Sequence, residues 1–289
     1  MNSTERKILP HSRRREIFKL LIEHGPLSLT AMRACIYPPI KKKRLYEVIK
    51  RLTKRRLIVK RMNKSTERGS SYYQITQEPK GLKAVASAIG IIEGNLRQPQ
   101  FRRIELFHSE MCAIWKELLC HLFPKSEVVR EHLFASNPQA TLVLLGSQRD
   151  TELRPDLLLF DRNSTSNELV SVAVEIERNH KSRERLTKKL RKYTNQSLVD
   201  GVIYVCDSTQ LSSRLRDVYQ SDVVKNAPRI NHYGVNFFLF TDGSLSNFGK
   251  EPEMFNGNFE RVSLADWLNT LKSTRLAARR DSKFSTPGL

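Results

Sequence analysis

The first 58 residues carry apolar side chains at helical spacing, interrupted by residues that break helices. In residues 14–24, apolar side chains fall at i, i+3 and i+4, which predicts a helix that ends at Gly25 and Pro26. Residues 28–36 predict a second, shorter helix, and residues 40–58 predict a third. Either Ser28 or Thr30 is a suitable cap for the second helix.

Two strand-like runs follow, at residues 57–62 and 71–76, joined by a polar loop that contains a glycine. A further helix is expected from residue 79 as a connector. We therefore divide the chain into a first domain (1–80), a connector (81–100), a second domain (101–272) and a basic flexible tail (273–289).

The second domain alternates helical and strand-like patterns, which predicts an α/β (α+β) fold with a mixed central sheet. Residues 101–123 predict a long helix, with Leu106, Met111, Ile114, Leu118 and Leu122 on its buried side. The predicted strands are 126–134, 154–163, 169–177, 200–208 and 234–244. The other predicted helices are 180–196, 212–222 and 264–280. The short polar turn between the second and third of these strands predicts an antiparallel hairpin.

Charge is distributed unevenly along the chain. Residues 1–80 hold 21 Lys and Arg against 6 Asp and Glu, a net charge of +15, out of a total of +20 for 289 residues. A basic cluster of this kind is typical of a domain that binds a polyanion, and nucleic acid is the expected partner. The third predicted helix contains a single acidic residue, Glu47. If its many Lys and Arg side chains were only exposed to solvent, they would repel one another.

Three helices followed by a hairpin resemble the winged helix-turn-helix fold, in which the third helix enters the major groove of DNA. The resemblance covers residues 12–77 and implies phosphate contacts from the hairpin loop. The residues expected to bind double-stranded DNA are Lys42, Lys43, Arg44, Lys50, Arg51, Lys54, Lys64 and Arg68.

Several classes of protein are disfavoured by the sequence. The four cysteines form no CxxC pair, which argues against a cysteine-based zinc site or a disulfide framework and fits a reducing cytoplasm. No apolar run approaches 18 residues, and the N-terminus lacks the apolar core of a signal peptide. A cytoplasmic protein without membrane association is expected.

Acidic side chains mark the ends of the two hairpin strands in the second domain. Asp156 precedes one strand and Glu175 lies near the end of the next, with 18 residues between them. A hairpin of this length can bring both carboxylates to one edge of the sheet. Such hard oxygen ligands suit Mg²⁺ or Mn²⁺, which can orient a phosphate and lower the pKa of attacking water.

The motifs "RPD" at 154–156 and "EIE" at 175–177 resemble the PD-(D/E)xK nuclease superfamily. Asp156 and Glu175 match its two acids, whereas Glu177 stands where the family usually has Lys. The resemblance implies that Glu177 is a general base or a third metal ligand. The cation is then supplied by Lys181, Lys188 or Lys189.

The same resemblance implies that Glu110, on the helix before the hairpin, supports the metal. His108 and Glu131 are weaker candidates nearby. Arg185, with Lys181 and Lys188, is expected to hold the cleaved strand or to stabilise the developing charge. Tyr193 shares helical spacing with Leu186 and Leu190, so core packing is favoured over a role as nucleophile.

A winged helix followed by "RPD", "EIER" and the residues Arg185, Lys189 and Tyr193 is similar to the replication–relaxation family, which includes the MOBC-class mobilisation relaxases. The resemblance implies a protein that binds a plasmid transfer origin and nicks one strand by metal-dependent cleavage. Coupling or mobilisation proteins are the implied partners.

Two alternatives stay open. One is a replication or transcription regulator whose nuclease-like domain is inactive. The other is a double-strand endonuclease of the defence or transposition type, which would require paired active sites and hence a homodimer.

Overall fold

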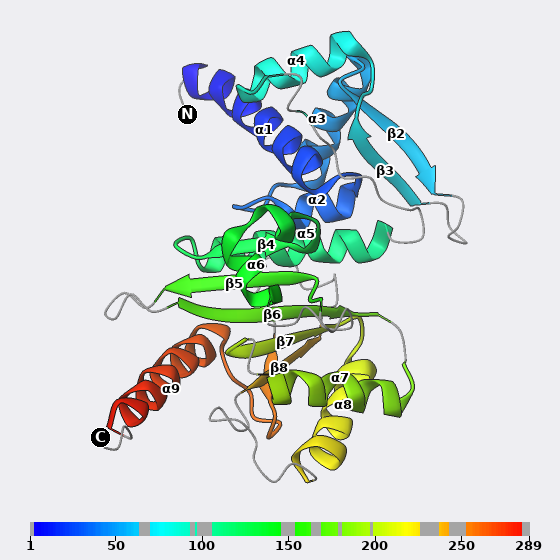
Figure 1. Ribbon diagram of the computed structural model, residues 1–289. Coiled ribbons are helices and arrows are strands. Elements are labelled where there is room, and N and C mark those ends of the chain that lie inside the picture. Colours follow the sequence, from blue (N-terminus) through cyan, green and yellow to red (C-terminus); the bar gives the residue numbers. More distant parts are fainter. Residues whose placement is uncertain are drawn as a thin grey trace. The chain divides into compact units, whose positions relative to one another are not determined.

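The structure is a computed structural model that describes residues 3–63, 70–92, 96, 106–145, 154–162, 169–178, 181–196, 199–225, 237–242 and 253–284. The chain forms two compact units, residues 1–121 and residues 122–289 (Figure 1). The helix that was expected to begin the second domain therefore belongs almost entirely to the first unit. The predicted hairpin-loop residues Lys64 and Arg68 lie outside the described residues.

The first unit combines helices with a small antiparallel sheet. Its elements are α1 (Ser3–His24), β1 (Leu27–Ser28), α2 (Leu29–Cys35), α3 (Lys42–Lys54), β2 (Ile58–Asn63), β3 (Ser70–Ile75), α4 (Pro79–Ile89) and α5 (Leu106–Leu122). The sheet order is β1-β3-β2, with both pairings antiparallel. The two-residue strand β1 was not predicted from the sequence.

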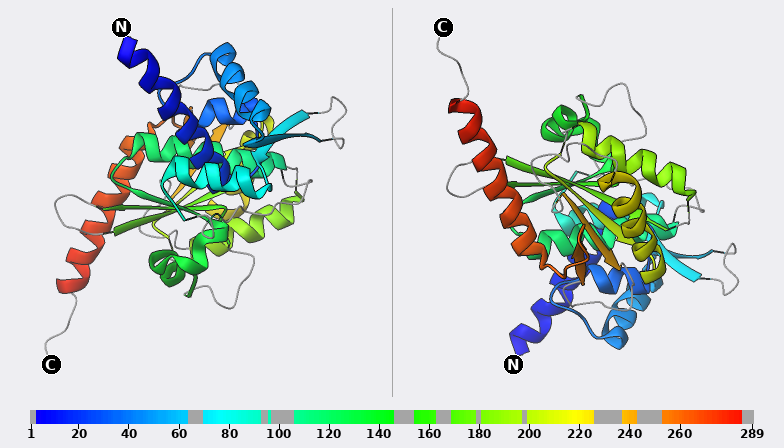
Figure 2. Two further views of the ribbon diagram at one scale, coloured as in Figure 1. Left: turned by 90° about the horizontal axis from the view of Figure 1, so that it is seen from above. Right: turned by 90° about the horizontal axis from the view of Figure 1, so that it is seen from below.

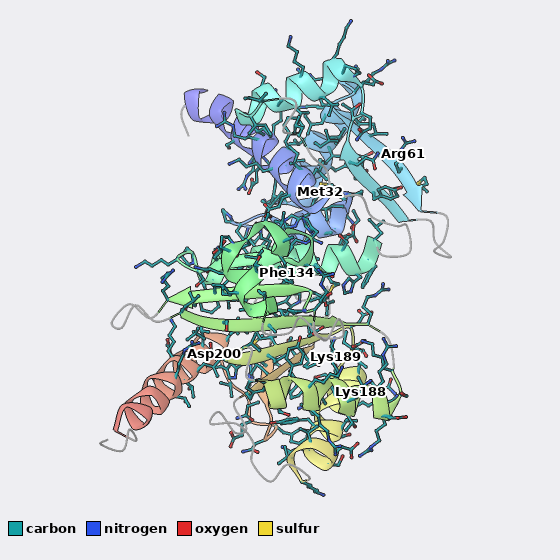
Figure 3. All side chains as sticks on the ribbon, in the orientation of Figure 1. Met32, Arg61, Phe134, Lys188, Lys189 and Asp200 are labelled. Carbon is teal, nitrogen blue, oxygen red and sulfur yellow. The ribbon has the colours of Figure 1, made fainter. Side chains whose placement is uncertain are left out.

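Local sequence explains where these helices begin and end. The Ser28 hydroxyl caps α2 by accepting the backbone N–H of Ala31 at 3.1 Å, which identifies Ser28 as the cap. Helix α1 ends at His24, where Gly25 has a φ of +76°, a conformation that glycine adopts without strain. Within the unit, Leu21 of α1 and Met32 of α2 are fully buried; Met32 is labelled in Figure 3.

The second unit is built on a six-stranded mixed sheet. Its strands are β4 (Glu127–Arg130), β5 (Leu157–Arg162), β6 (Leu169–Glu177), β7 (Gly201–Cys206), β8 (Phe238–Asp242) and β9 (Met254–Asn256), in that spatial order. Strands β4, β5 and β6 are antiparallel neighbours, whereas β6, β7 and β8 run parallel. The mixed α/β architecture predicted from the sequence is confirmed, and β9 is an addition to it.

The helices of this unit are η3 (Glu131–Ser136), α6 (Pro138–Leu145), α7 (Arg183–Gln196), α8 (Thr209–Val218), η5 (Tyr219–Val224) and α9 (Leu264–Phe284). One hydrophobic core joins α7, α8 and η5 to one face of the sheet, and it includes Phe134 and Tyr219. Helix α9 packs against the opposite face, where Trp267 and Leu271 contact Gly201 (Figure 2).

The last helix differs from the sequence-based expectation of a flexible tail after residue 272. Helix α9 continues to Phe284, and Arg275 within the expected tail pairs with the buried carboxylate of Asp200. A second ion pair joins Lys272 to Asp161. These two cations anchor the helix to the sheet. Their partners, Asp161 and Asp200, lie far away in the sequence, so the basic and polar C-terminal residues gave no sign of the pairing.

Candidate functional site

The ends of β5 and β6 bring Asp156 and Glu175 together. Strand β5 begins at Leu157, which pairs with Val174 of β6, so Asp156 comes directly before β5 and lies close enough to Glu175 to affect its charge. The backbone N–H of Asp156 donates to the carbonyl of Val174 at 3.0 Å. The Asp156 carboxylate accepts the backbone N–H of Ile176 at 2.7 Å, which fixes it at the strand end.

Glu175 is a buried carboxylate with two side-chain partners. It is 4% exposed, the ammonium of Lys189 lies 2.7 Å from its Oε2, and the hydroxyl of Tyr193 donates to its Oε1. Burial raises the pKa of Glu175, Lys189 lowers it, and the nearby Asp156 carboxylate raises it again, with a raised pKa as the result. The electrostatic influence of Asp156 on Glu175 agrees with their placement at the ends of neighbouring strands.

Helix α7 supplies both partners of Glu175. Lys189 and Tyr193 are four residues apart, so they lie on the same side of the helix, and this side faces the sheet. Burial lowers the pKa of Lys189, but Glu175, Asp156 and Glu177 outweigh it and leave the pKa raised. Burial and the Glu175 charge raise the pKa of Tyr193 well above its usual value. A neutral tyrosine that donates to Glu175 fits this environment.

Glu177 has a separate cation. It is 4% exposed and pairs with Lys181, whose Nζ lies 2.5 Å from Glu177 Oε2. Two residues along a strand span about 6.5 Å, so Glu175 and Glu177 share a face but stand apart. In the described part of the chain, the oxygens of Asp156, Glu175 and Glu177 do not all come within 4.8 Å of one another. Among the described residues, these three carboxylates therefore do not form one compact group of metal ligands.

The other two basic residues predicted for this site lie on the outer surface of α7. Arg185 and Lys188 are exposed, whereas Lys189, the neighbour of Lys188, turns inward to Glu175 (Figure 3). Among the three lysines considered for the cation, Lys189 thus contacts Glu175 and Lys181 contacts Glu177. The i,i+4 spacing of Lys189 and Tyr193 was the available signal that they share a face.

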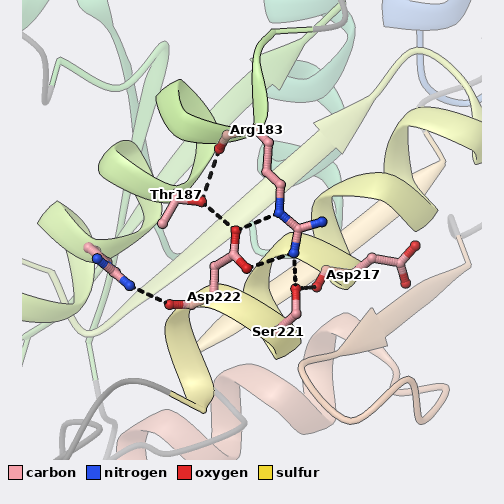
Figure 4. A network of polar contacts seen from close by, with 6 residues as sticks. Arg183, Thr187, Asp217, Ser221 and Asp222 are labelled. Carbon is pink, nitrogen blue, oxygen red and sulfur yellow. Dashed lines mark hydrogen bonds and ion pairs between the residues drawn. The ribbon is translucent and has the colours of Figure 1, made fainter.

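A polar network fixes α7 against η5 (Figure 4). Arg183 donates to both carboxylate oxygens of Asp222, from Nε at 2.8 Å and from Nη2 at 2.6 Å. Thr187 donates to the same carboxylate at 2.9 Å, and Arg191 donates to the Asp222 carbonyl at 2.7 Å. Hydrogen bonding from Arg183 holds the pKa of Asp222 far below its usual range. The network holds in place the helix that carries Lys189 and Tyr193.

The remaining acid and histidine candidates have other contacts. Glu110 is buried on α5 in the first unit, where its carboxylate accepts the backbone N–H of Ser28. Burial raises the pKa of Glu110, and the bond from Ser28 partly offsets this. His108 is a half-buried residue of α5. Glu131 donates its backbone N–H to the carbonyl of Asp156 at 3.1 Å, and its carboxylate lies 4.0 Å from Arg154.

The predicted DNA-binding helix presents its cations outward. Leu45, Ile49 and Leu52 of α3 are buried. The exposed basic residues of this helix are Lys42, Lys43, Arg44, Lys50, Arg51 and Lys54. Lys60 and Arg61 on β2 are also exposed and were not included in the sequence-based set. Because successive side chains of a strand point to opposite faces, the strand pattern alone did not predict that both would be exposed.

Comparison of the chain with protein-family models, curated proteins and solved structures finds no match. Within the described residues, no helix is both long enough and apolar enough to cross a membrane.

Proposed function

We propose that this protein is a metal-dependent DNA endonuclease that nicks one strand at a plasmid transfer origin, as a relaxase of the replication–relaxation type. The observation that carries the proposal is the neighbouring acids Asp156 and Glu175, set at the ends of two central strands beside the half-buried ammonium of Lys189. Two carboxylates and a lysine at a strand edge are the groups that metal-dependent phosphodiester cleavage requires.

The order of elements supports a PD-(D/E)xK-like second domain. A helix and an antiparallel β4-β5-β6 sheet are followed by α7 and then by β7, which is parallel to β6. This is the order that the motif resemblance implies. The first unit, with its three helices and the β2–β3 hairpin, has the order of a winged helix-turn-helix domain.

Each part has a role in this proposal. The exposed cations of α3 position the protein on double-stranded DNA through phosphate contacts and base reading in the groove. Asp156 and Glu175 would hold Mg²⁺ or Mn²⁺, because carboxylate oxygens are hard ligands and hydrogen bonds fix both side chains at the strand ends. The bound ion would orient the phosphate and acidify water.

The side chains around these acids orient the Glu175 carboxylate and balance its negative charge. Tyr193 holds the Glu175 carboxylate through its hydroxyl, and Lys189 compensates the Glu175 charge. Glu177, paired with Lys181, would accept a proton from the attacking water, and the exposed Lys188 and Arg185 on the outer surface of α7 would attract the DNA backbone. The proposal implies a cytoplasmic location and coupling or mobilisation proteins as partners.

A second function is favoured by a specific observation. Asp156 is hydrogen-bonded to the Ile176 backbone, Glu175 to Lys189 and Tyr193, and Glu177 to Lys181. Acids that are satisfied internally in this way suit a domain without chemistry. The alternative is therefore a DNA-binding replication or transcription regulator with an inactive nuclease-like domain.

A supercoiled-plasmid assay separates these functions. The plasmid carries DNA that flanks the gene, and the full chain is tested with Mg²⁺ and with Mn²⁺. The proposal predicts open-circular product from the wild type and its loss in Asp156→Ala. Glu184→Gln, at an exposed acid of α7, is the matched control and keeps activity. DNA binding without cleavage in either metal supports the regulator, and linear product supports a dimeric double-strand endonuclease.

A further inference from the structure

A cluster of three potential metal ligands lies in the first unit, away from the strand acids in sequence. Glu23 and His24 are the last two residues of α1, and Glu117 lies on α5. One ligand atom from each lies within 4.8 Å of the others. His24 Nε2 is 2.8 Å from Glu117 Oε1. The cluster joins helices that are about 90 residues apart in sequence.

The three side chains differ in their access to solvent in a way that suits ion binding. The His24 imidazole is fully buried, whereas the carboxylates of Glu23 and Glu117 are 36% and 23% exposed. Both glutamates line a cavity of about 610 Å³ in this unit. An ion held by the three residues would therefore have a rigid nitrogen ligand on its protein side and room for water on the cavity side.

We propose that Glu23, His24 and Glu117 bind a divalent transition-metal ion, with Zn²⁺ as the preferred ion. One imidazole nitrogen and two carboxylate oxygens are an accepted zinc ligand set, and a water from the cavity completes four-coordination. Mg²⁺ suits this set less well, because it binds oxygen ligands and retains its water shell. The site is independent of the proposed nuclease function, and it links α1 to α5.

Lys116 provides a feature that distinguishes this site from a simple ion-pair cluster. Its ammonium contacts Glu23, so it neutralises that carboxylate when no ion is bound. A cation at the cluster must compete with this ammonium. Removal of Lys116 should therefore strengthen metal binding. If the cluster served only to hold the two helices together, removal of Lys116 would break its contact with Glu23 without increasing the affinity for a metal ion.

The test uses isothermal titration of the full chain with ZnCl₂, in an Asp156→Ala background that removes one strand acid while the Glu175–Lys189 ion pair stays intact. We expect binding of one Zn²⁺ per chain, and we expect the affinity to fall by at least about tenfold in Glu23→Gln and in Glu117→Gln. Glu16→Gln, which lines the same cavity and pairs with Arg13, is the control and should bind as the background does. Lys116→Met should bind roughly tenfold more tightly.

Thermal unfolding gives a second readout. Zn²⁺ should raise the melting temperature of the background protein, because it binds only the folded cluster, and it should not do so in Glu117→Gln. Equal zinc affinity in the background, Glu23→Gln and Glu117→Gln would overturn the proposal and assign the binding to other side chains. Weaker binding by Lys116→Met, or no binding by any variant, would also overturn it.

Discussion

The pairing of Lys189 with Glu175 predicts a large and pH-dependent effect of Lys189→Met. The substitution keeps an unbranched side chain of similar length but removes the ammonium, which lies 2.7 Å from a carboxylate that is 4% exposed. Loss of one partner of a buried pair costs about 3–5 kcal/mol, because the remaining charge is left uncompensated. Since the Tyr193 hydroxyl still donates to Glu175, we expect a value near the lower limit, about 3 kcal/mol at pH 8.

The pH dependence follows from the direction of the Glu175 pKa. The pKa of Glu175 in the folded protein is raised above its ordinary value of 4.5. At a pH between the unfolded-state pKa and the folded-state pKa, the folded protein therefore binds more protons than the unfolded protein does. The free energy of unfolding falls as the pH rises through this range. Lys189 lowers the pKa of Glu175, so Lys189→Met raises it further and widens the range upward. The variant should therefore be penalised less at pH 5, where Glu175 can protonate, than at pH 8.

Urea unfolding followed by the fluorescence of Trp267 measures this effect. Trp267 is buried in the second unit, and a Trp115→Phe background removes the other tryptophan, which lies in the first unit. The matched control is Lys188→Met, at an exposed neighbour on the same helix, which should change stability by no more than about 0.5 kcal/mol. Equal destabilisation by the two variants, or a Lys189→Met penalty that is the same at pH 5 and pH 8, would refute the reasoning.

Three further predictions follow from the same structure. Tyr193→Phe removes the hydroxyl that donates to Glu175 but keeps the ring in the core, so urea unfolding should show a free energy of unfolding lower by about 1–3 kcal/mol. An unchanged free energy of unfolding would mean that this hydrogen bond is absent in solution. Gly201→Ala places a Cβ 2.7 Å from Leu271, so it should cost about 1–3 kcal/mol and shift Trp267 emission to longer wavelength, and unchanged emission would contradict the packing of α9. Lys50→Ala should weaken DNA binding and reduce the slope of log affinity against log salt by about 0.9, whereas an unchanged slope would remove Lys50 from the phosphate contacts.

The hairpin and its acids were predictable because they depend on local pattern. Apolar runs on both sides of a short polar turn predict antiparallel strands, and the hairpin then places Asp156, directly before β5, near Glu175 on β6. The cation was harder to identify. Lys188 and Lys189 are adjacent in sequence, and only the rotation of α7 decides which of them faces the sheet, whereas Lys181 precedes the helix.

Long-range contacts account for most of what the sequence did not reveal. Helical spacing correctly favoured core packing for Tyr193, but the hydroxyl contact with Glu175 depends on how α7 crosses β6. On α5, Leu106, Met111 and Ile114 of the predicted buried side are buried, whereas Leu118 and Leu122 are half-buried and the neighbouring Leu119 is fully buried. The extension of α9 depends on acids far away in the sheet, such as the Asp200 partner of Arg275.

The most direct test of the central claim is the nicking of supercoiled plasmid by Glu175→Gln in Mg²⁺ and Mn²⁺, compared with the wild type at equal DNA binding. Gln has nearly the shape of Glu, but it lacks the charge that a metal ligand at this position supplies. The account predicts open-circular product from the wild type and its loss in the variant. Nicking by Glu175→Gln at the wild-type rate would contradict the assignment of Asp156 and Glu175 as the catalytic pair.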